Sequence, residues 1–472
     1  IPHRLDQVVK EYLHRTLPPA KRALGGKGDK KFTDLSAGVF AGWAARHARA
    51  VLDAWPKIRA RLVQDGQLDY LERIELPLSW VLGDMEIAGI AVDPASLASM
   101  GQEFSARLAE YEAKIHALAG HPFNIASPKQ LGTVLFDELK LPVIKKNKSG
   151  YSTDAEVLER LAPRHEIAQL LLEHRKLAKL INTYTDVLQA AVNPETGRIH
   201  ATFQQTVSAT GRLITTDPDL QRTPIKTPEG RRIRQTFVAA PGHKLISADW
   251  SQIELRLLAH VSHDPLLVEA FTHNLDIHRR TAAQIFGCPL DQVTPEQRST
   301  GKLVNFATIY GQGATALAQI LGVPRKDAQG YIDSYFTAYS GVRRWLDATM
   351  QKAHELGYVT TLLGRRRYIP ELSSNNVMDR QAGERIAANT PIQGSAADLC
   401  KLAMLNIARR LRAEKLATRM LLQIHDELVF EAPLAEVDTV CAIAREAMEG
   451  AYKLDVPLVV DVGVGDTWAE AH

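Results

Sequence analysis

The sequence predicts an α+β protein with several subdomains, and three observations lead to this prediction. The chain has 472 residues, more than one ordinary hydrophobic core accommodates, so two to four domains or subdomains are expected. Helical periodicity dominates the first 184 residues and residues 260–379, whereas strand-like runs gather between them and near the end of the chain. This order indicates a helical part, a sheet-bearing part, a helical insertion and a return to the sheet.

The first 184 residues are predicted to be mainly helical. Residues 1–64 have a helical, basic pattern that the Pro/Gly/Lys-rich loop at 17–31 interrupts. In NIASPKQLGTVLF, Ser127 is placed to cap a helix that begins at Pro128. The helix N-terminus beside Lys129 suits a backbone phosphate, and an ordinary cap explains the pattern equally well. An amphipathic helix is predicted where apolar residues recur at three- and four-residue steps. These are Leu97, Phe104, Leu108, Tyr111 and Ile115.

Strands are predicted from residue 196 onward. GRIHATFQQT (197–206) and KLISADW (244–250) have strand-like composition, with turn signals at 194–197 and 241–242. Residues 260–379 return to a helical pattern, and the remainder is mixed. The chain has neither internal repeats nor low-complexity tracts.

The amino-acid composition excludes few classes of protein function. Charged residues make up 24% and apolar residues 45%, which is typical of soluble globular proteins. The net charge of +3 does not point to nucleic acid. Three basic segments do so weakly, because such runs are usually solvated faces. They are 222–234, 145–148 and 365–367.

The cysteines and the chain's beginning favour an intracellular protein. Three distant cysteines, Cys288, Cys400 and Cys441, have no metal-ligand spacing and are expected to be free thiols in a reducing cytosol. No apolar run reaches the roughly 18 residues of a membrane helix, and no signal peptide opens the sequence. The first residue is Ile1, so we expect the natural chain to begin upstream.

Two acidic segments carry the strongest chemical signal. Asp249 and Asp426, separated by 426 − 249 = 177 positions, each follow an apolar, strand-like run. If the fold brings them together, the two carboxylates repel each other unless a cation lies between them. A hard cation such as Mg²⁺ accepts oxygen ligands and keeps positions for substrate phosphates. The pair therefore indicates two-metal phosphoryl transfer.

A helix in the insertion carries a second signal. Arg298, Lys302, Phe306 and Tyr310 are four apart, so each lies about 40° around the helix from the last. Two cations followed by two aromatic rings suit a triphosphate and a stacked base. An amphipathic helix with snorkelling cations is an equally good explanation without further context. Gly301 within this helix is expected to cost roughly 1 kcal/mol relative to Ala.

These motifs together resemble a known family. KxxxFxxxYG (302–311), DxSQIELR (249–256) and HDELVF (425–430) resemble motifs B, A and C of family A DNA polymerases. Their order along the chain, A then B then C, and their spacing resemble those of the family. The resemblance extends from about residue 68 to His472 and includes TGRL (210–213), DIHR (276–279) and ERIAANTPIQGSAAD (384–398). Each motif alone is moderately specific, and the ordered set leaves little room for chance.

The resemblance implies a metal-dependent catalytic centre. Asp249 and Asp426 match the aspartates that hold two Mg²⁺ ions, for which Mn²⁺ is a possible substitute. The backbone carbonyl of Trp250 is implied as a further ligand. Lys302 is implied as the catalytic proton donor to departing pyrophosphate. Glu427 is expected to support the site without binding metal.

It also implies a site for the incoming dNTP. Arg298, Lys302 and His278 match residues that grip the triphosphate, and Phe306 matches the ring that stacks on base and sugar. Glu254 matches the steric gate against a ribose 2′-hydroxyl, with Tyr310 beneath it and Gln252 nearby. Without the family, Glu254 would be explained as an acid in the first turn of a helix.

DNA contacts are implied at two places. The family's minor-groove and primer-end contacts match five residues of this chain: Arg212, Arg385, Asn389, Gln393 and His425. Polar side chains suit the minor groove, because every base pair presents hydrogen-bond acceptors there. Lys129 and Arg222 are expected to contact primer–template DNA farther from the centre.

Departures from the family pattern concern affinity, fidelity and proofreading. Ser299 replaces a second Arg in motif B, and LITTDPDLQR carries the changes Ile214, Asp219 and Arg222. In residues 1–64 the exonuclease motif Tyr-x-x-x-Asp is replaced by Trp43 to His47, so no proofreading is expected from this chain.

The resemblance finally implies a right-hand polymerase, with an antiparallel palm sheet, helical fingers and thumb, and a degenerate 3′–5′ exonuclease-like N-terminal segment. The predicted parts are an exonuclease remnant (1–64), palm (65–91), thumb (92–184), palm with motif A (185–259), fingers with motif B (260–379) and palm with motif C (380–472). The expected activity is DNA-directed DNA polymerisation by a cytoplasmic monomer without membrane contact. A single-subunit RNA polymerase and an inactive primer–template binding module are the alternatives, and a nuclease is the weakest one.

Overall fold

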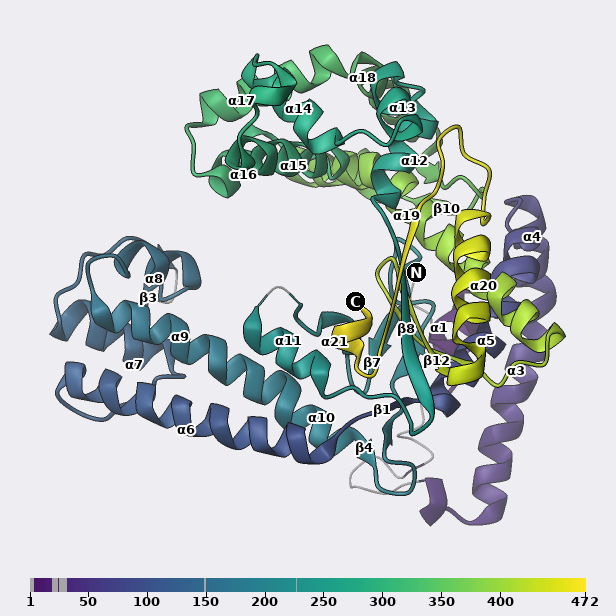
Figure 1. Ribbon diagram of the computed structural model, residues 1–472. Coiled ribbons are helices and arrows are strands. Elements are labelled where there is room, and N and C mark those ends of the chain that lie inside the picture. The colour runs from purple at the N-terminus through teal and green to yellow at the C-terminus, as the bar shows by residue number, and fades with distance from the viewer. Residues whose placement is uncertain (1–3, 19–23, 25–31, 148–149, 226) are drawn as a thin grey trace.

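A central antiparallel sheet lies between two helical lobes (Figure 1). The structure is a computed structural model that describes residues 4–18, 24, 32–147, 150–225 and 227–472. Helices α6 to α9 form the lobe at the left of Figure 1, and α13 to α18 form the lobe at the top. The α+β fold class predicted from the sequence is confirmed. Within the described ranges, no helix is both long enough and apolar enough to cross a membrane.

The central sheet brings the two acidic segments together. Its order is β11-β12-β8-β13, and every neighbouring pair is antiparallel. On one face the Trp250 indole donates to the Met448 carbonyl of α20 at 3.1 Å. On the other face Trp468 of α21 packs edge-on against Phe237, with ring centroids 5.4 Å apart. The elements span β8 (His243–Trp250), β11 (Arg419–Ile424), β12 (Glu427–Pro433), β13 (Val460–Gly465), η8 (Leu434–Glu436), α20 (Val437–Glu449) and α21 (Trp468–Ala471).

The described residues also form four smaller sheets, one of which, the β2–β3 hairpin, belongs to the left lobe (Figure 1). The turn signal at 194–197 connects β4 to β5, and the strand predicted at 197–206 is two short strands, β5 and β6. The hairpins at 146–151 and 358–368 lie in segments predicted to be loop and helix. The strands are β1 (Ile90–Ala91), β2 (Lys146–Asn147), β3 (Gly150–Tyr151), β4 (Val192–Asn193), β5 (Arg198–Ile199), β6 (Thr202–Gln204), β7 (Ile214–Thr216), β9 (Tyr358–Thr360) and β10 (Arg366–Tyr368).

The left lobe has its own apolar core. The predicted amphipathic helix is α6, in which Leu97, Phe104 and Ile115 are buried. The predicted cap is also present, because the Ser127 hydroxyl accepts a hydrogen bond from the Gln130 amide. The elements are α6 (Pro94–Ala119), α7 (Pro128–Gly132), η3 (Thr133–Glu138), α8 (Ala155–Leu161), α9 (Glu166–Leu180), η4 (Ile181–Thr185) and α10 (Asp186–Ala191).

The upper lobe is the predicted helical insertion. The boundaries predicted at 259 and 379 lie inside α12 and α19, and the boundary at 184 lies inside η4. A helix that crosses such a boundary connects two parts rigidly, which residue patterns alone do not reveal. The elements are α12 (Ile253–Ser262), α13 (Pro265–Thr272), α14 (Ile277–Phe286), η6 (Leu290–Gln292), α15 (Pro295–Ile309), α16 (Ala314–Leu321), α17 (Arg325–Ala338), α18 (Ser340–Leu356), η7 (Pro370–Ser373) and α19 (Val377–Ala413).

The N-terminal part is helical, as predicted. The helix α3 is 28 residues long and contains Pro56. Most of the predicted Pro/Gly/Lys loop at 17–31 lies outside the described residues. The remaining elements are α1 (Leu5–Leu13), η1 (Phe32–Asp34), α3 (Ala37–Gln64), α4 (Leu68–Tyr70), η2 (Leu71–Glu75), α5 (Leu76–Ala88), η5 (Leu220–Arg222) and α11 (Pro228–Gln235).

Candidate active site

One predicted aspartate lies near the end of β8, and the other lies in the turn before the neighbouring strand β12. Asp249 is the penultimate residue of β8, and its register partner on β12 is Glu427. Asp426 precedes Glu427 in the tight turn between β11 and β12, and its carbonyl accepts the Trp250 amide at 3.3 Å. Asp461 of β13 faces Asp249 from the other side. Because register partners point to the same face of a sheet, Asp461, Asp249 and Glu427 form a row of three acids.

Electrostatics in this row favour a bound cation. Burial, followed by the nearby charges of Asp426 and Glu427, raises the pKa of Asp249 to about 7. Burial also raises the pKa of Asp426. Two carboxylates that resist ionisation in the same place are stabilised by a positive ion between them.

Glu427 differs from its neighbours because its charge is already compensated. Burial opposes its ionisation, but hydrogen bonds from His472, Ser247 and Trp468 outweigh burial and lower its pKa. The Ser247 hydroxyl lies 2.6 Å and the Trp468 indole 2.9 Å from its Oε1 atom. The guanidinium of Arg234 lies 3.6 Å away. These contacts hold Glu427 in place, and its role as a supporting acid that does not bind metal stays a prediction.

A polar cavity of about 500 Å³ connects Asp426 with the predicted stripe of α15. Arg298, Lys302, Phe306 and Tyr310 all line it, as the four-residue spacing predicts. The other lining residues that the sequence singled out are Arg212, Gln252, Glu254, His278, His425 and Asp426. Asp249 lines a separate cavity of about 480 Å³ with Ser247, Asp461 and His472.

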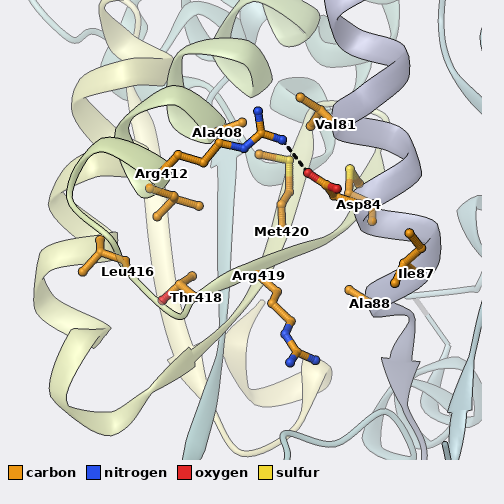
Figure 2. A pocket seen from close by; sticks show the side chains of 12 residues that line it. Val81, Asp84, Ile87, Ala88, Ala408, Arg412, Leu416, Thr418, Arg419 and Met420 are labelled. Carbon is orange, nitrogen blue, oxygen red and sulfur yellow. Dashed lines mark hydrogen bonds and ion pairs between the residues drawn. The ribbon is translucent and has the colours of Figure 1, made fainter.

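A third cavity, of about 410 Å³, lies elsewhere, between α5, the end of α19 and β11 (Figure 2). An ion pair of 2.6 Å between Arg412 and Asp84 spans its mouth. Its lining is mainly apolar and includes none of the predicted site residues. We therefore place the candidate active site at the polar cavity.

Close packing of α14 on α15 positions the basic end of the stripe. A Cβ atom at Gly301 would lie 2.4 Å from the His278 carbonyl oxygen, so only glycine permits this approach. Thr294 and Gln297 form a capping box at the start of α15. Arg298 pairs with Asp276 at 2.6 Å. Burial, followed by the charge of Lys302, lowers the pKa of His278 to about 4, so its imidazole is neutral near pH 7.

Glu254 links three elements at the other end of the cavity. It is buried in the first turn of α12, and burial raises its pKa. Its carboxylate accepts from Arg212 at 2.8 Å and from the Tyr310 hydroxyl at 3.0 Å. The rings of Phe306 and Tyr310 stack with centroids 6.4 Å apart. Glu254 is therefore a fixed wall of the cavity, with Tyr310 beside it as expected.

The other predicted DNA contacts are distributed over three places. Arg385, Asn389 and Gln393 lie on successive turns of α19, and the Oδ1 atom of Asn389 is buried without a hydrogen-bond partner. Lys129 is exposed on α7, at the far end of the left lobe (Figure 1). Arg222 is exposed but pairs with Asp219 at 3.0 Å. The two departures from the family pattern thus pair with each other, and a DNA contact by Arg222 stays a prediction.

The three basic segments are less available than their composition indicates. Arg234 is buried, and Arg365 is largely buried and pairs with Asp398 at 2.9 Å. Arg232 pairs with Glu103 and Lys145 with Asp154, at 2.6 and 3.0 Å. Lys148 and Lys226 lie outside the described residues. The interpretation of these runs as solvated or phosphate-binding faces is wrong for Arg234 and Arg365, because distant carboxylates pair with them inside the protein.

Sequence reasoning missed the residues that support the two aspartates. Arg234 stacks its guanidinium 3.8 Å from the centroid of the Trp468 ring, beneath Glu427. Arg256 donates to two backbone carbonyls behind the turn that follows Asp249. Arg256 belongs to the motif DxSQIELR, and its place in this motif is the sequence feature that could have identified it. Nothing in the local sequence pointed to Arg234 and Trp468, which are 234 positions apart.

The donor set fits a divalent ion that keeps open positions. No group of three or more His, Cys, Asp or Glu side chains within the described ranges has the arrangement of a metal site. Asp249 and Asp426, with the Trp250 carbonyl, supply fewer protein ligands than that. Mg²⁺ is commonly bound by one or two carboxylates together with substrate phosphates and water, so the small set is appropriate.

Comparison with known proteins defines the class. The family model of DNA polymerase family A matches residues 94–470, and the chain belongs to this family. It is 46% identical over 466 residues to DNA polymerase I of Bacillus subtilis, covering 98% of this chain and 53% of that protein. It is 48% identical over 400 residues to the thermostable DNA polymerase I of Thermus thermophilus, covering 84% and 48%. The chain thus spans about half the length of the curated relatives it matches.

A solved structure confirms the right-hand fold. It is the POL domain of Pol1 from M. smegmatis in complex with a DNA primer-template and dNTP, with a TM-score of 0.90 and 42% identity. The match covers 100% of this chain and 80% of that one. Members of the family use divalent metal ions.

Proposed function

We propose that this chain is a DNA-directed DNA polymerase that adds dNTPs to a primer 3′-hydroxyl on a DNA template and releases pyrophosphate. One observation carries the proposal: Asp426, the Arg298–Tyr310 stripe and the Glu254 wall line a single polar cavity. Nucleotidyl transfer requires an acid that binds metal, cations that bind the triphosphate and a side chain that limits the space for the sugar. The named relatives and the primer-template complex of the structural neighbour support it.

Asp249, Asp426 and the Trp250 carbonyl would hold the divalent ions, which we propose to be two Mg²⁺, with Mn²⁺ as a substitute. When bound, the ions lower the pKa of the primer hydroxyl and offset charge on the triphosphate. The two aspartates would orient the reacting groups, and Glu427, the register partner of Asp249 on β12, stays ionised beside them through its contacts with Ser247 and Arg234.

The incoming nucleotide would lie along α15. Arg298 and Lys302 bind its phosphates, neutral His278 donates one hydrogen bond to a phosphate oxygen, and Lys302 gives a proton to the departing pyrophosphate. Phe306 stacks on base and sugar. Glu254, fixed by Arg212 and Tyr310, fills the space of a 2′-hydroxyl, and Gln252 lines the same wall.

Duplex DNA would approach the cavity from α19 and the left lobe. Arg212, Arg385, Asn389, Gln393 and His425 would contact the minor groove and primer end, where acceptors are common to all base pairs. Lys129 and Arg222 would contact the backbone, with Arg222 contributing little because Asp219 pairs with it.

We propose that the N-terminal segment has no proofreading activity. At the motif position His47 hydrogen-bonds the Trp43 carbonyl at 2.9 Å, and its ring lies 3.9 Å from that of Trp43. A histidine that packs on an aromatic ring does not replace a carboxylate ligand. The chain should therefore leave a 3′-labelled primer intact in the absence of dNTPs. By similarity to its bacterial relatives, we propose that it acts as a monomer in the cytoplasm.

Primer extension tests the proposal. Asp426→Asn should lower extension by at least about a thousandfold while duplex affinity stays within a few fold, because it removes a ligand and not a DNA contact. Asp438→Asn, an exposed acid of α20, is the matched control. Robust synthesis by Asp426→Asn would refute the assignment. Equal use of rNTPs would indicate an RNA polymerase, and duplex binding without Mg²⁺-dependent pyrophosphate release would indicate a binding module.

A further inference from the structure

The turn after Asp249 has an unusual backbone. Gln252, which precedes α12, has φ 55° and ψ 39°, the left-handed conformation that side chains other than glycine and asparagine rarely adopt. The turn connects Trp250, whose amide bonds the Asp426 carbonyl, to Glu254. Any change in this turn therefore moves residues of both the acidic pair and the Glu254 wall.

Left-handed Gln252 leaves the Ser251 carbonyl without a helix donor. The first available amides of α12, those of Leu255 and Arg256, both donate to the Gln252 carbonyl at 3.1 Å. The side chain of Arg256 replaces them, because its Nε atom donates to the Ser251 carbonyl at 2.8 Å. The Ser251 amide is held separately, by the Val459 carbonyl at 2.9 Å. The two peptide groups that flank Ser251 are thus both held by hydrogen bonds.

Arg256 is itself immobilised by two other segments. It is 3% exposed. Its Nη1 atom donates to the Pro457 carbonyl at 2.6 Å, in the segment before β13. Its guanidinium lies over the Phe271 ring of α13, with Cζ 4.7 Å from the centroid. One planar group therefore joins the turn, the lead-in to β13 and a helix of the upper lobe.

We infer that Arg256 is a positioning residue for sugar selection: by satisfying the Ser251 carbonyl it keeps Gln252 left-handed and so sets the height of Glu254 in the cavity. This inference rests on the proposed polymerase function, in which Glu254 excludes the ribose 2′-hydroxyl. Arg256 does not line the cavity, so it acts through the turn and not by contact with the nucleotide. A lysine keeps the charge but cannot reach two carbonyls and stack at once.

The alternative is that Arg256 only stabilises the fold. Arg198 supplies a control with the same chemistry, since it donates to the Gly89 carbonyl at 2.8 Å and pairs with Glu431 at 3.0 Å. It is also largely buried, and neither it nor its partners line the cavity. Arg256→Lys and Arg198→Lys should therefore lose similar stability if packing is the whole role of both.

Two measurements on these variants test the inference. Arg256→Lys should lower the ratio of kcat/KM for dNTP to that for rNTP by about tenfold, because a small displacement of Glu254 opens the 2′ position. Arg198→Lys should leave this ratio unchanged. In the protein without substrates, amide exchange at Ser251–Glu254 should rise at least about tenfold in Arg256→Lys and stay at the wild-type rate in Arg198→Lys.

The two readouts separate the possible failures. An unchanged selectivity ratio, or an equal loss in Arg198→Lys, would overturn the inference while leaving polymerisation intact. An unchanged exchange rate at the turn would overturn it even if the wild-type chain failed to extend primers. A wild-type chain without extension, but with the expected local exchange, would refute the proposed function and leave the positioning of the turn supported.

Discussion

Gly301→Ala is the change for which two opposing effects can be weighed from the structure. In an exposed helix, alanine is favoured over glycine by about 1 kcal/mol. At Gly301, however, the new Cβ would lie 2.4 Å from the His278 carbonyl oxygen and 2.8 Å from the Ala282 amide nitrogen of α14. Real Cβ contacts are essentially never under 3.0 Å, so α14 has to move by at least 3.0 − 2.4 = 0.6 Å.

The net effect should be destabilising. Both close atoms belong to the backbone, so no side-chain rotation relieves the contact, and overpacking of this kind costs about 1–3 kcal/mol. Subtracting the propensity gain leaves a loss of about 1 kcal/mol. Because His278 lines the cavity and moves with α14, KM for dNTP should also rise by about fivefold.

Gly330→Ala in α17 is the matched control. Gly330 lies in the same lobe, is exposed, and has no atom within 4 Å of its would-be Cβ. It should gain about 1 kcal/mol and leave KM unchanged. Urea unfolding of both variants, together with steady-state kinetics, measures the difference of about 2 kcal/mol. A Gly301→Ala variant as stable as Gly330→Ala, with wild-type KM, would refute the close-packing argument.

Two further predictions concern charge. The pKa of Asp249 is raised from 3.8 to about 7 in the fold, so the folded chain keeps a proton that the unfolded chain loses. Without divalent ions, the contribution of Asp249 to stability is therefore fully present below about pH 4 and is lost, by about 4 kcal/mol, as pH rises to 7. In denaturant melts in EDTA, the wild type should lose this free energy of unfolding relative to Asp249→Asn over that range. A wild type whose pH dependence equals that of Asp249→Asn contradicts the raised pKa of Asp249. At the Arg222–Asp219 pair, Arg222→Ala should change duplex affinity by less than about twofold, whereas Asp219→Asn frees the cation and should steepen the logarithmic salt dependence by about one unit. A salt slope that instead falls by one unit in Arg222→Ala would show that Arg222 already contacts phosphate.

Spacing along single elements could be predicted from the sequence. Residues four apart on one helix share a face whatever the rest of the chain does, so the Arg298–Tyr310 stripe was predictable as a unit. The Ser127 cap and the apolar face of α6 follow from equally local rules. The meeting of Asp249 with Asp426 needed the family resemblance, because strand pairing over 177 positions has no local signal.

Charge partners could not be predicted in the same way. Arg234, Arg365 and Arg222 all appeared as members of basic runs, yet their carboxylate partners determine whether they are buried, paired or free. Asp398, which pairs with Arg365, lies 33 positions farther along. A run of like charge therefore predicts a surface only when its partners are known. The stability effect of Gly301 could not be predicted for a related reason. Its cost in helix propensity can be read from the sequence of α15, but the close packing that it permits involves α14.

Backbone strain at the site argues that both acidic turns are maintained by their surroundings. Left-handed residues other than glycine often end helices, as His14 and His263 do here. Gln252 and His425 are at no helix end of that kind. Gln252 begins α12, and His425 occupies a two-residue hairpin turn that usually takes glycine or asparagine.

Each of these two residues is held by a side chain from a neighbouring position. Arg256 bonds the carbonyl before Gln252, and the Gln423 amide donates to the His425 carbonyl at 2.6 Å. Both strained residues line the cavity. Each lies next to or within three residues of a metal-binding aspartate in the proposed mechanism. A backbone conformation strained by roughly 1–3 kcal/mol per residue persists only where the surrounding contacts hold it in place. The turns therefore aim side chains at one cavity, at a cost in stability that relaxed turns would avoid.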